Sequence, residues 1–139
     1  MDVTYDPCAT QVVANEAATD DEVASLAAAL ALWNERGGFA LTAPNAGDGG
    51  ERPALRVRFQ VEFGAFRGFY DDEVGEIIVN RNLARDQRTI TIAHELGHAF
   101  GLWHVATSAR RSVMNPRNTT IAPLPRDIDD VRALWGSCR

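Results

Sequence analysis

The chain has 139 residues, a length that suits one domain with a single core and leaves no room for a second. Hydrophobic residues make up 45% and charged residues 24%, which is average globular usage and excludes a disordered or fibrous protein. The formal net charge of −5 argues against binding to a phosphate backbone, so no nucleic-acid partner is expected. The longest apolar stretch, residues 23–33, is too short to span a bilayer. We therefore expect no membrane partner. The chain is also expected to be a monomer.

The two cysteines lie at opposite ends of the chain, Cys8 near the start and Cys138 next to the end. Their spacing matches no metal-binding motif and no redox pair. One disulfide between the termini is expected, and it implies an oxidising compartment. The alternative is a free Cys8 thiolate that folds over a metal site and blocks it.

The first half of the chain predicts a helix and a strand. Asp20 is a candidate N-cap, apolar residues recur at helical spacing from Val23 to Trp33, and the helix is expected to stop at Gly37-Gly38. Residues 44–53 are rich in Gly, Asn and Asp and predict a loop. Apolar and polar residues then alternate over 55–61, which predicts a strand with one buried face.

The second half predicts two short strands and two helices. The strands are expected near residues 67–70 and over residues 77–79. A helix capped by Asp86 is expected to run through His98 and to end at Gly101. A loop over residues 115–125 then precedes a terminal helix over 127–135.

The helix after Asp86 leads into a cluster of histidines. Residues 94–104 read HELGHAFGLWH and contain the only three histidines of the chain. Because residues four apart share a helix face, His94 and His98 can present two imidazoles to one metal ion. Gly101 falls where positive φ can end the helix and turn the chain, which delivers His104 as a third ligand. Three imidazoles with an open fourth position describe a catalytic zinc site.

Glu95 follows the first histidine, where it is directed away from the ligand face but placed to hold a metal-bound water. That is the position of a general base. The alternative interpretation is a buried helix whose histidines bond to backbone carbonyls and hold no metal.

The motif from His94 to His104, H-E-x-x-H-x-x-G-x-x-H, resembles that of the metzincin clan of zinc endopeptidases. A second clan feature is a methionine turn, which Met114 in the segment Ser-Val-Met-Asn-Pro resembles. Within the clan, residues 127–136 are similar to the C-terminal helix of matrixins, the matrix metalloproteinase family. This comparison implies that Asp127 hydrogen-bonds the methionine turn, whereas the residue by itself predicts an N-cap of the last helix.

The resemblance implies an α+β, zincin-like fold. Its parts are a small twisted mixed sheet, a backing helix, an active-site helix and a short C-terminal subdomain that ends in a helix. The boundary is expected near residue 101, with residues 1–101 forming an upper subdomain and residues 102–139 a lower one of the same catalytic domain.

The resemblance also implies that a protein or peptide substrate binds in extended form. It would pair antiparallel with an edge strand formed by Glu76 to Asn80. The pocket for residues after the scissile bond would be walled by residues 105–123, where Arg110 and Arg111 are candidates to favour an acidic or polar residue. The candidate substrate-binding residues of the strand are Ile77, Ile78 and Val79.

The chain departs from the matrixin pattern in several places. No histidine remains for the second, structural zinc of matrixins, so one zinc ion is expected. Val105 replaces the serine that usually follows the third histidine, and Arg126 replaces the acid that pairs with the mature N-terminus. Secretion is expected from the cysteines and the resemblance. Four acids are candidate Ca²⁺ ligands, but no calcium-loop motif supports them and exposed acids are the simpler interpretation: Asp48, Asp71, Asp72 and Glu73.

The predicted function is a zinc-dependent endopeptidase in which Glu95 acts as general base. A metal-dependent ribonuclease is the first alternative, because one bacterial rRNA-processing family has the same spacing of histidines and glycine. That family lacks the glutamate after the first histidine, so Glu95 favours the peptidase. The second alternative is a non-catalytic zinc-binding decoy with a peptidase fold.

Overall fold

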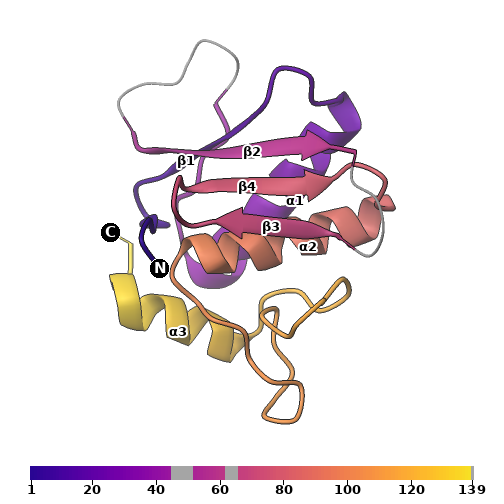
Figure 1. Cartoon of the computed structure of the whole chain (residues 1–139). Helices are drawn as coiled ribbons and strands as arrows, with labels where there is room; N and C mark the ends of the chain where they lie inside the picture. The colour runs from indigo at the N-terminus through magenta and orange to yellow at the C-terminus, as the bar shows by residue number, and fades with distance from the viewer. Residues whose placement is uncertain (45–51, 62–65, 139) are drawn as a thin grey trace.

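The computed structural model describes residues 1–44, 52–61 and 66–138. A four-stranded sheet lies on one side of the molecule, and helices α1 and α2 cover one of its faces (Figure 1). The strand order is β1 (Gln11–Ala14), β2 (Ala54–Gln60), β4 (Glu76–Asn80) and β3 (Gly68–Asp71). The first three of these run parallel, and β3 runs antiparallel to β4. The expected small mixed sheet is therefore confirmed.

Strand β2 shows why the sheet has one buried face. Its apolar residues Leu55, Val57 and Phe59 are buried, whereas Arg56 and Arg58 between them are exposed. The side-chain period of a strand is two, so this alternation directs all three apolar side chains to the same face. Strand β1 was not predicted, because its four residues QVVA do not alternate in this way.

Strand β4 is an interior strand, which corrects the prediction that it forms the substrate-binding edge. It is hydrogen-bonded to β2 on one side and to β3 on the other. Both of its backbone edges are therefore used within the sheet, and Ile77, Ile78 and Val79 have no edge to offer a peptide. The edge strand on this side is β3, which pairs with β4 through the register Tyr70 to Ile77.

Helix α1 (Asp20–Gly37) is bounded by local signals on both sides. Thr19, and not Asp20, is its N-cap: the Thr19 hydroxyl accepts a hydrogen bond from the Glu22 N–H, and the Glu22 carboxylate accepts one from the Thr19 N–H. The C-cap after the last helical residue is Gly38, whose φ of 67° lies in the left-handed region that glycine adopts without strain. The apolar residues buried along its inner face are Leu26, Ala29, Leu30 and Trp33.

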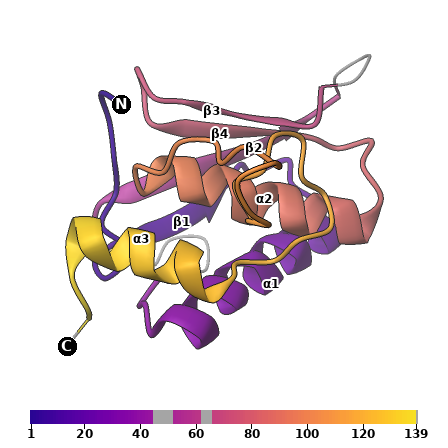
Figure 2. The same cartoon turned by 90° about the horizontal axis from the view of Figure 1, so that it is seen from below.

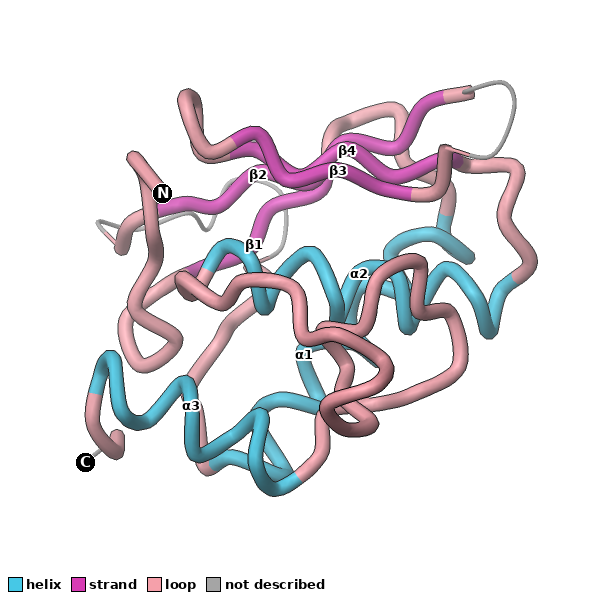
Figure 3. Tube along the Cα trace, turned by 60° about the horizontal axis from the view of Figure 1, so that its bottom comes forward, coloured by secondary structure: helices cyan, strands magenta, loops and turns pink. Residues whose placement is uncertain are grey.

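Helix α2 (Arg85–Ala99) packs against α1 and against strands β3 and β4 (Figure 3). Asp86 was expected to cap it, but the N-cap position is Ala84, which makes no side-chain hydrogen bond. Tertiary contacts stabilise the first turns instead. Asp21 on α1 forms ion pairs with Arg85 and Arg88, and the buried Arg88 also donates to the Ser25 hydroxyl at 3.0 Å.

Trp33 fixes the middle of α2 against α1. Its indole is fully buried and donates a hydrogen bond to the Ala93 carbonyl at 3.0 Å. Its ring also meets Phe100 edge-on, with the ring centroids 5.3 Å apart. The residue before the first histidine is thus held by a buried side chain of the backing helix.

Helix α3 (Pro125–Trp135) lies beside α1 on the side opposite the sheet, as seen from below in Figure 2. It begins two residues before the expected start at Asp127. Arg132 donates to the Gly37 carbonyl at 2.7 Å, and Trp135 donates to the Phe100 carbonyl at 2.8 Å. These bonds attach the last helix to the ends of both α1 and α2.

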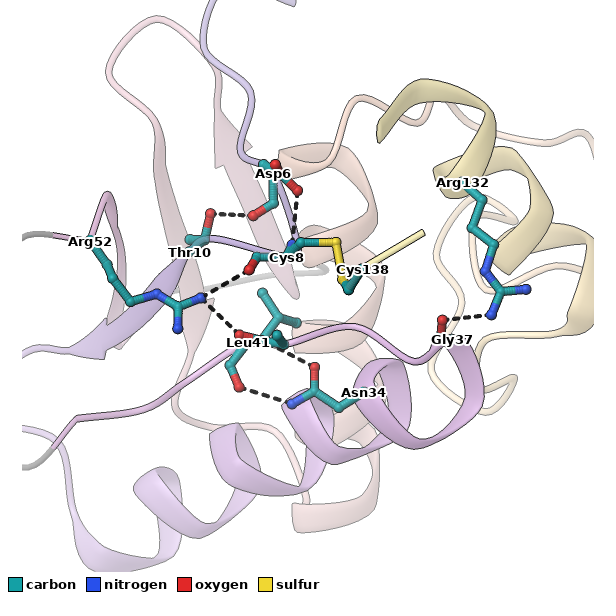
Figure 4. The surroundings of a disulfide bond; sticks show 10 residues. Asp6, Cys8, Thr10, Asn34, Gly37, Leu41, Arg52, Arg132 and Cys138 are labelled. Atoms are coloured by element: carbon teal, nitrogen blue, oxygen red, sulfur yellow. Dashed lines mark hydrogen bonds between the residues drawn. A yellow bond between two sulfur atoms is a disulfide. The ribbon is translucent and has the colours of Figure 1, made fainter. Parts of the chain in front are cut away.

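The two ends of the chain are joined by a disulfide between Cys8 and Cys138, as predicted (Figure 4). Arg52 supports the same region by donating to the backbone carbonyls of Cys8 and Ala40. The alternative, a Cys8 thiolate over the metal site, does not fit this pairing.

Most of the predicted loop over 44–53 lies outside the described residues. Within the described residues, no helix is long and apolar enough to cross a membrane.

Removing the disulfide should destabilise the protein strongly. The bond closes a loop of 130 residues, so the double substitution Cys8→Ala, Cys138→Ala should lower the free energy of unfolding by about 4 to 5 kcal/mol on the chain-entropy model. Urea unfolding of the variant and the oxidised wild type measures the difference. A loss below about 1 kcal/mol would contradict the chain-entropy argument for this bond.

Candidate metal centre and active-site cleft

The three histidines of the motif come together at the end of α2. His94 and His98 lie one turn apart on the helix, and His104 reaches them from the segment that follows. Their ring centroids are separated by 4.8 to 5.3 Å. One ligand nitrogen from each ring lies within 4.8 Å of the other two. Among the described residues, this is the one group of His, Cys, Asp or Glu side chains close enough to share a metal ion.

The chain reverses at Gly101 in the way the spacing predicts. Gly101 has a φ of 105°, which a residue with a side chain adopts only with strain. Its N–H donates to the His98 carbonyl, and the Leu102 N–H donates to the Gly97 carbonyl, both at 2.9 Å. This turn ends the helix and directs His104 back toward the other two histidines.

Backbone carbonyls orient two of the three imidazoles. His94 Nδ1 lies 2.7 Å from the Val113 carbonyl oxygen, and His98 Nδ1 lies 2.8 Å from the Leu102 carbonyl oxygen. A carbonyl only accepts, so each Nδ1 carries the proton and each Nε2 is left as the free ligand atom. Carbonyl bonding is also what the metal-free alternative predicted, but that alternative gives no reason for three rings to converge.

Burial keeps these rings neutral. It lowers the pKa of His98 to about 4 and also lowers the pKa of His94, although the hydrogen bonds to Leu102 and Val113 oppose the effect. Metal binding requires the neutral imidazole. Three imidazoles with an open side are the donor set of a catalytic Zn²⁺ site, so the residues present fit this ion.

Glu95 lies beside the histidines beneath strand β3. Its side chain is buried, and burial raises its pKa to about 8, while a hydrogen bond from the Tyr70 backbone acts in the opposite direction. The strand comes this close because of Gly68: a Cβ there would lie 2.7 Å from Thr91 Cγ2 and 3.3 Å from Glu95 Cγ. A glycine within a strand often marks such a close approach.

Met114 packs beneath the histidine helix, as the comparison with metzincins implies. It is almost fully buried, and a Cβ at Gly97 would lie 2.3 Å from its Sδ atom. Glycine between Glu95 and His98 therefore leaves the space that the methionine fills. The Met114 N–H donates to the Ser112 hydroxyl and its carbonyl accepts from the Val105 N–H, which ties the turn to the segment after His104.

Asp127 is the centre of the hydrogen-bond network beneath the site. Its buried carboxylate accepts from the Ser112 hydroxyl at 2.5 Å and from the Val113 N–H at 2.9 Å. The carbonyl of Val113 in turn accepts from His94. Asp127 is not the N-cap of the last helix, because α3 starts at Pro125; it accepts instead from the N–H of the capping residue Leu124.

The structure corrects the proposed roles of Arg110 and Arg111. Arg110 forms ion pairs with Asp127 and Asp130, both at 2.9 Å, and only 15% of its side chain is exposed. Its guanidinium is therefore committed to helix α3 and is not free to select a substrate. Arg111 is exposed, but it does not line the cleft at the histidines.

The histidines and Glu95 form the floor of a cleft of about 660 Å³. One wall comes from residues 66–70, which belong to β3 and the segment just before it, and the loop after the methionine turn contributes Arg117 and Asn118. The Thr91 hydroxyl, also in the lining, is the one buried side-chain polar atom of the described residues that lacks a hydrogen-bond partner. The lining residues that the sequence did not identify are Met1, Phe66, Arg67, Gly68, Phe69, Tyr70, Asp72, Thr91, Trp103, Arg117 and Asn118.

Gly68 was the one sequence signal for the β3 wall of the cleft, because an isolated glycine in a predicted strand indicates close approach of another element.

The calcium candidates gain no support. Asp72 accepts a hydrogen bond from the Asp2 N–H, Asp71 accepts one from the Glu73 N–H, and Asp48 lies outside the described residues.

Replacing Asp127 should damage the whole site. In Asp127→Asn, an NH₂ group replaces one of the two accepting oxygens, so it faces hydrogen-bond donors from which it cannot accept. Arg110 also loses its buried, negatively charged partner. We expect the free energy of unfolding to fall by about 3 to 5 kcal/mol. Asp130→Asn removes the exposed partner of the same arginine and should cost at most about 1 kcal/mol. Equal losses in urea unfolding would contradict the central role of Asp127.

Comparison with known proteins supports this assignment of the fold. The model of a peptidase family, described as the IrrE N-terminal-like domain, matches residues 51–102. No curated protein sequence is significantly similar to the chain.

Two solved structures are similar to the chain over most of its length. The archaemetzincin of Methanopyrus kandleri is 16% identical with a TM-score of 0.62, and the match covers 90% of this chain and 93% of that one. High choriolytic enzyme 1, a hatching enzyme zinc-protease from the medaka fish Oryzias latipes, is 15% identical with a TM-score of 0.58, covering 94% and 90%. The chain therefore has a metzincin-like α+β fold that carries the three-histidine motif of the clan.

Proposed function

We propose that the protein is a zinc-dependent endopeptidase. One observation carries the proposal: three imidazole nitrogens converge beside a buried glutamate, on the floor of a cleft that is bounded by an edge strand. The family match and the similarity to zinc proteases support the same reaction class.

His94, His98 and His104 would hold the zinc ion through their free nitrogens. When bound, the ion supplies a Lewis acid that polarises the scissile carbonyl and increases the acidity of water. The carbonyls of Val113 and Leu102 keep the first two rings in the required tautomer and orientation. This proposal assigns one ion to the site and no role to calcium.

Glu95 would act as the general base. Its carboxylate lies next to the histidines but cannot join them as a ligand, because residues 94 and 95 point to different sides of the helix. It is therefore placed to accept a proton from the attacking water and to pass this proton to the leaving amine. The decoy alternative does not require such a side chain, and the ribonuclease family lacks one, so Glu95 favours the peptidase.

An extended substrate would pair with β3, which replaces β4 as the proposed peptide-binding edge. Strand β3 is the outermost strand of the sheet, and its residues Gly68 to Tyr70 line the cleft beside Glu95. An added strand would satisfy the free backbone groups on this edge. Antiparallel pairing is the orientation that the resemblance to metzincins implies.

The disulfide between the termini supports an oxidising, extracellular location.

Glu95→Gln tests the assignment of the base. This substitution preserves the size of the side chain and removes its ability to accept a proton, so peptide cleavage should fall by at least about 10²-fold while the zinc content stays at one ion. The measurements are cleavage of a proteome-derived peptide library, followed by mass spectrometry, and the metal content of the purified protein.

Glu73→Gln is the matched control, because Glu73 is exposed on the turn after β3 and does not line the cleft. It should cleave like the wild type. Removal of zinc with a chelator should abolish cleavage and zinc should restore it. A zinc-loaded wild type that cleaves no peptide, or a Glu95→Gln variant that retains full activity, would overturn the proposal.

A further inference from the structure

Two arginines of the cleft have no partner within the described part of the chain. Arg67 precedes β3 and Arg117 follows the methionine turn, so they come from opposite walls of the cleft. Neither guanidinium makes a hydrogen bond or an ion pair with a described residue. Three other arginines are paired with acids: Arg81 with Glu22, Arg88 with Asp21 and Arg110 with Asp127.

Both arginines belong to the same half of the cleft. Arg67 adjoins Gly68, which lies against Thr91 on α2. Arg117 adjoins Asn118, whose amide donates to the Val113 carbonyl at 3.0 Å, the same carbonyl that accepts from His94. Both arginines therefore line the cleft next to residues that lie close to the part of α2 before His98.

The opposite half of the cleft is bounded by an acid. Asp72 lies just beyond the other end of β3, where it accepts a hydrogen bond from the Asp2 N–H. The N-terminal segment at this end is held to the last residue of α2, because the Tyr5 N–H donates to the Ala99 carbonyl at 2.8 Å. The cleft thus has a positive end and a negative end, with Glu95 and the histidines between them.

The backbone at Arg117 is a second unusual feature. Its φ of 61° makes it the one residue other than glycine with a left-handed backbone among the described residues. Such a conformation costs an arginine free energy, and strain of this kind is concentrated at ligand-binding sites. The Asn118 side chain holds the loop in place through hydrogen bonds with Val113 and with both backbone groups of Ile121.

We infer that Arg67 and Arg117 select a substrate with an Asp or Glu side chain at the first position after the scissile bond. The inference rests on the proposed peptidase function and on antiparallel pairing with β3. In that orientation, the substrate residues that follow the scissile bond lie toward the start of β3, beside Arg67. A carboxylate there pairs with guanidinium groups that have no other counter-charge.

The test uses a pair of peptides that differ only by Glu or Gln at the first position after the cleaved bond. The wild type should prefer the Glu peptide by about tenfold in kcat/KM, since a hydrogen bond between two charged groups contributes about this much. The preference should decrease as salt is added, because both arginines are at least partly exposed. In the double variant Arg67→Glu, Arg117→Glu the preference should shift to a peptide with Lys at this position.

Two single variants and a binding measurement test which arginine carries the preference and whether the preference arises in binding. Arg117→Gly removes the guanidinium at a backbone conformation that glycine adopts freely, so it should fold normally and lose most of the preference. Arg111→Ala removes an exposed arginine that lies in the same loop but outside the cleft. This variant should keep the preference for the Glu peptide. Binding of the two peptides to the Glu95→Gln protein gives the same comparison without turnover.

The outcomes separate this inference from the proposed function. Equal cleavage of the Glu and Gln peptides by the wild type would leave the peptidase standing and overturn the inference. A preference that survives in Arg117→Gly and in the double Glu variant would overturn it as well. If the wild type cleaves neither peptide, the proposed function fails, and equal binding of both peptides to Glu95→Gln then overturns the inference independently.

Discussion

The peptide group of Val113 connects the buried charge of the protein to its metal site. Its N–H donates to the carboxylate of Asp127, and its carbonyl accepts from Nδ1 of His94. A buried carboxylate with four donors has little freedom to move, so it fixes the methionine turn, and the turn fixes the first imidazole. The orientation of His94 on α2 thus depends on a residue of α3, which follows it by 33 positions in the sequence.

The packing around α2 serves the same purpose. Strand β3 lies against one side of the helix at Gly68, Met114 lies against another at Gly97, and Trp33 donates to its backbone at Ala93. Two glycines allow neighbouring elements to approach more closely than any other residue would permit. The helix is therefore held on three sides, which leaves His94, Glu95 and His98 facing the cleft. Preorganisation of this kind is what a catalytic constellation requires.

The sequence was sufficient for the local features of the site and insufficient for those that depend on distant contacts. Helical periodicity placed His94 and His98 on one face, and a glycine at the correct distance predicted the turn that delivers His104. The two cysteines were paired correctly because they had no other partner. The edge strand was assigned wrongly, because strand order is decided by the antiparallel hairpin of β3 and β4 and not by the composition of either strand.

The arginines of the loop illustrate the same limit. Arg110 and Arg111 were chosen for their position in the expected wall, but side-chain pairing cannot be deduced from position alone. The acids that neutralise Arg110 come from α3, and the residue that reaches the cleft is Arg117, in a left-handed conformation that no sequence pattern indicated. Helix caps were likewise displaced by one or two residues, because Thr19 forms a better cap than Asp20 and ion pairs with Asp21 replace a cap at Asp86.

X-ray absorption at the zinc edge of the zinc-loaded protein reports on the metal centre itself. We expect one zinc ion with three imidazole nitrogens at about 2.0 Å and one oxygen of solvent at a similar distance. The chain has only three histidines, so this result would assign every ligand. A sulfur neighbour at about 2.3 Å, or fewer than three imidazoles, would contradict the site described here.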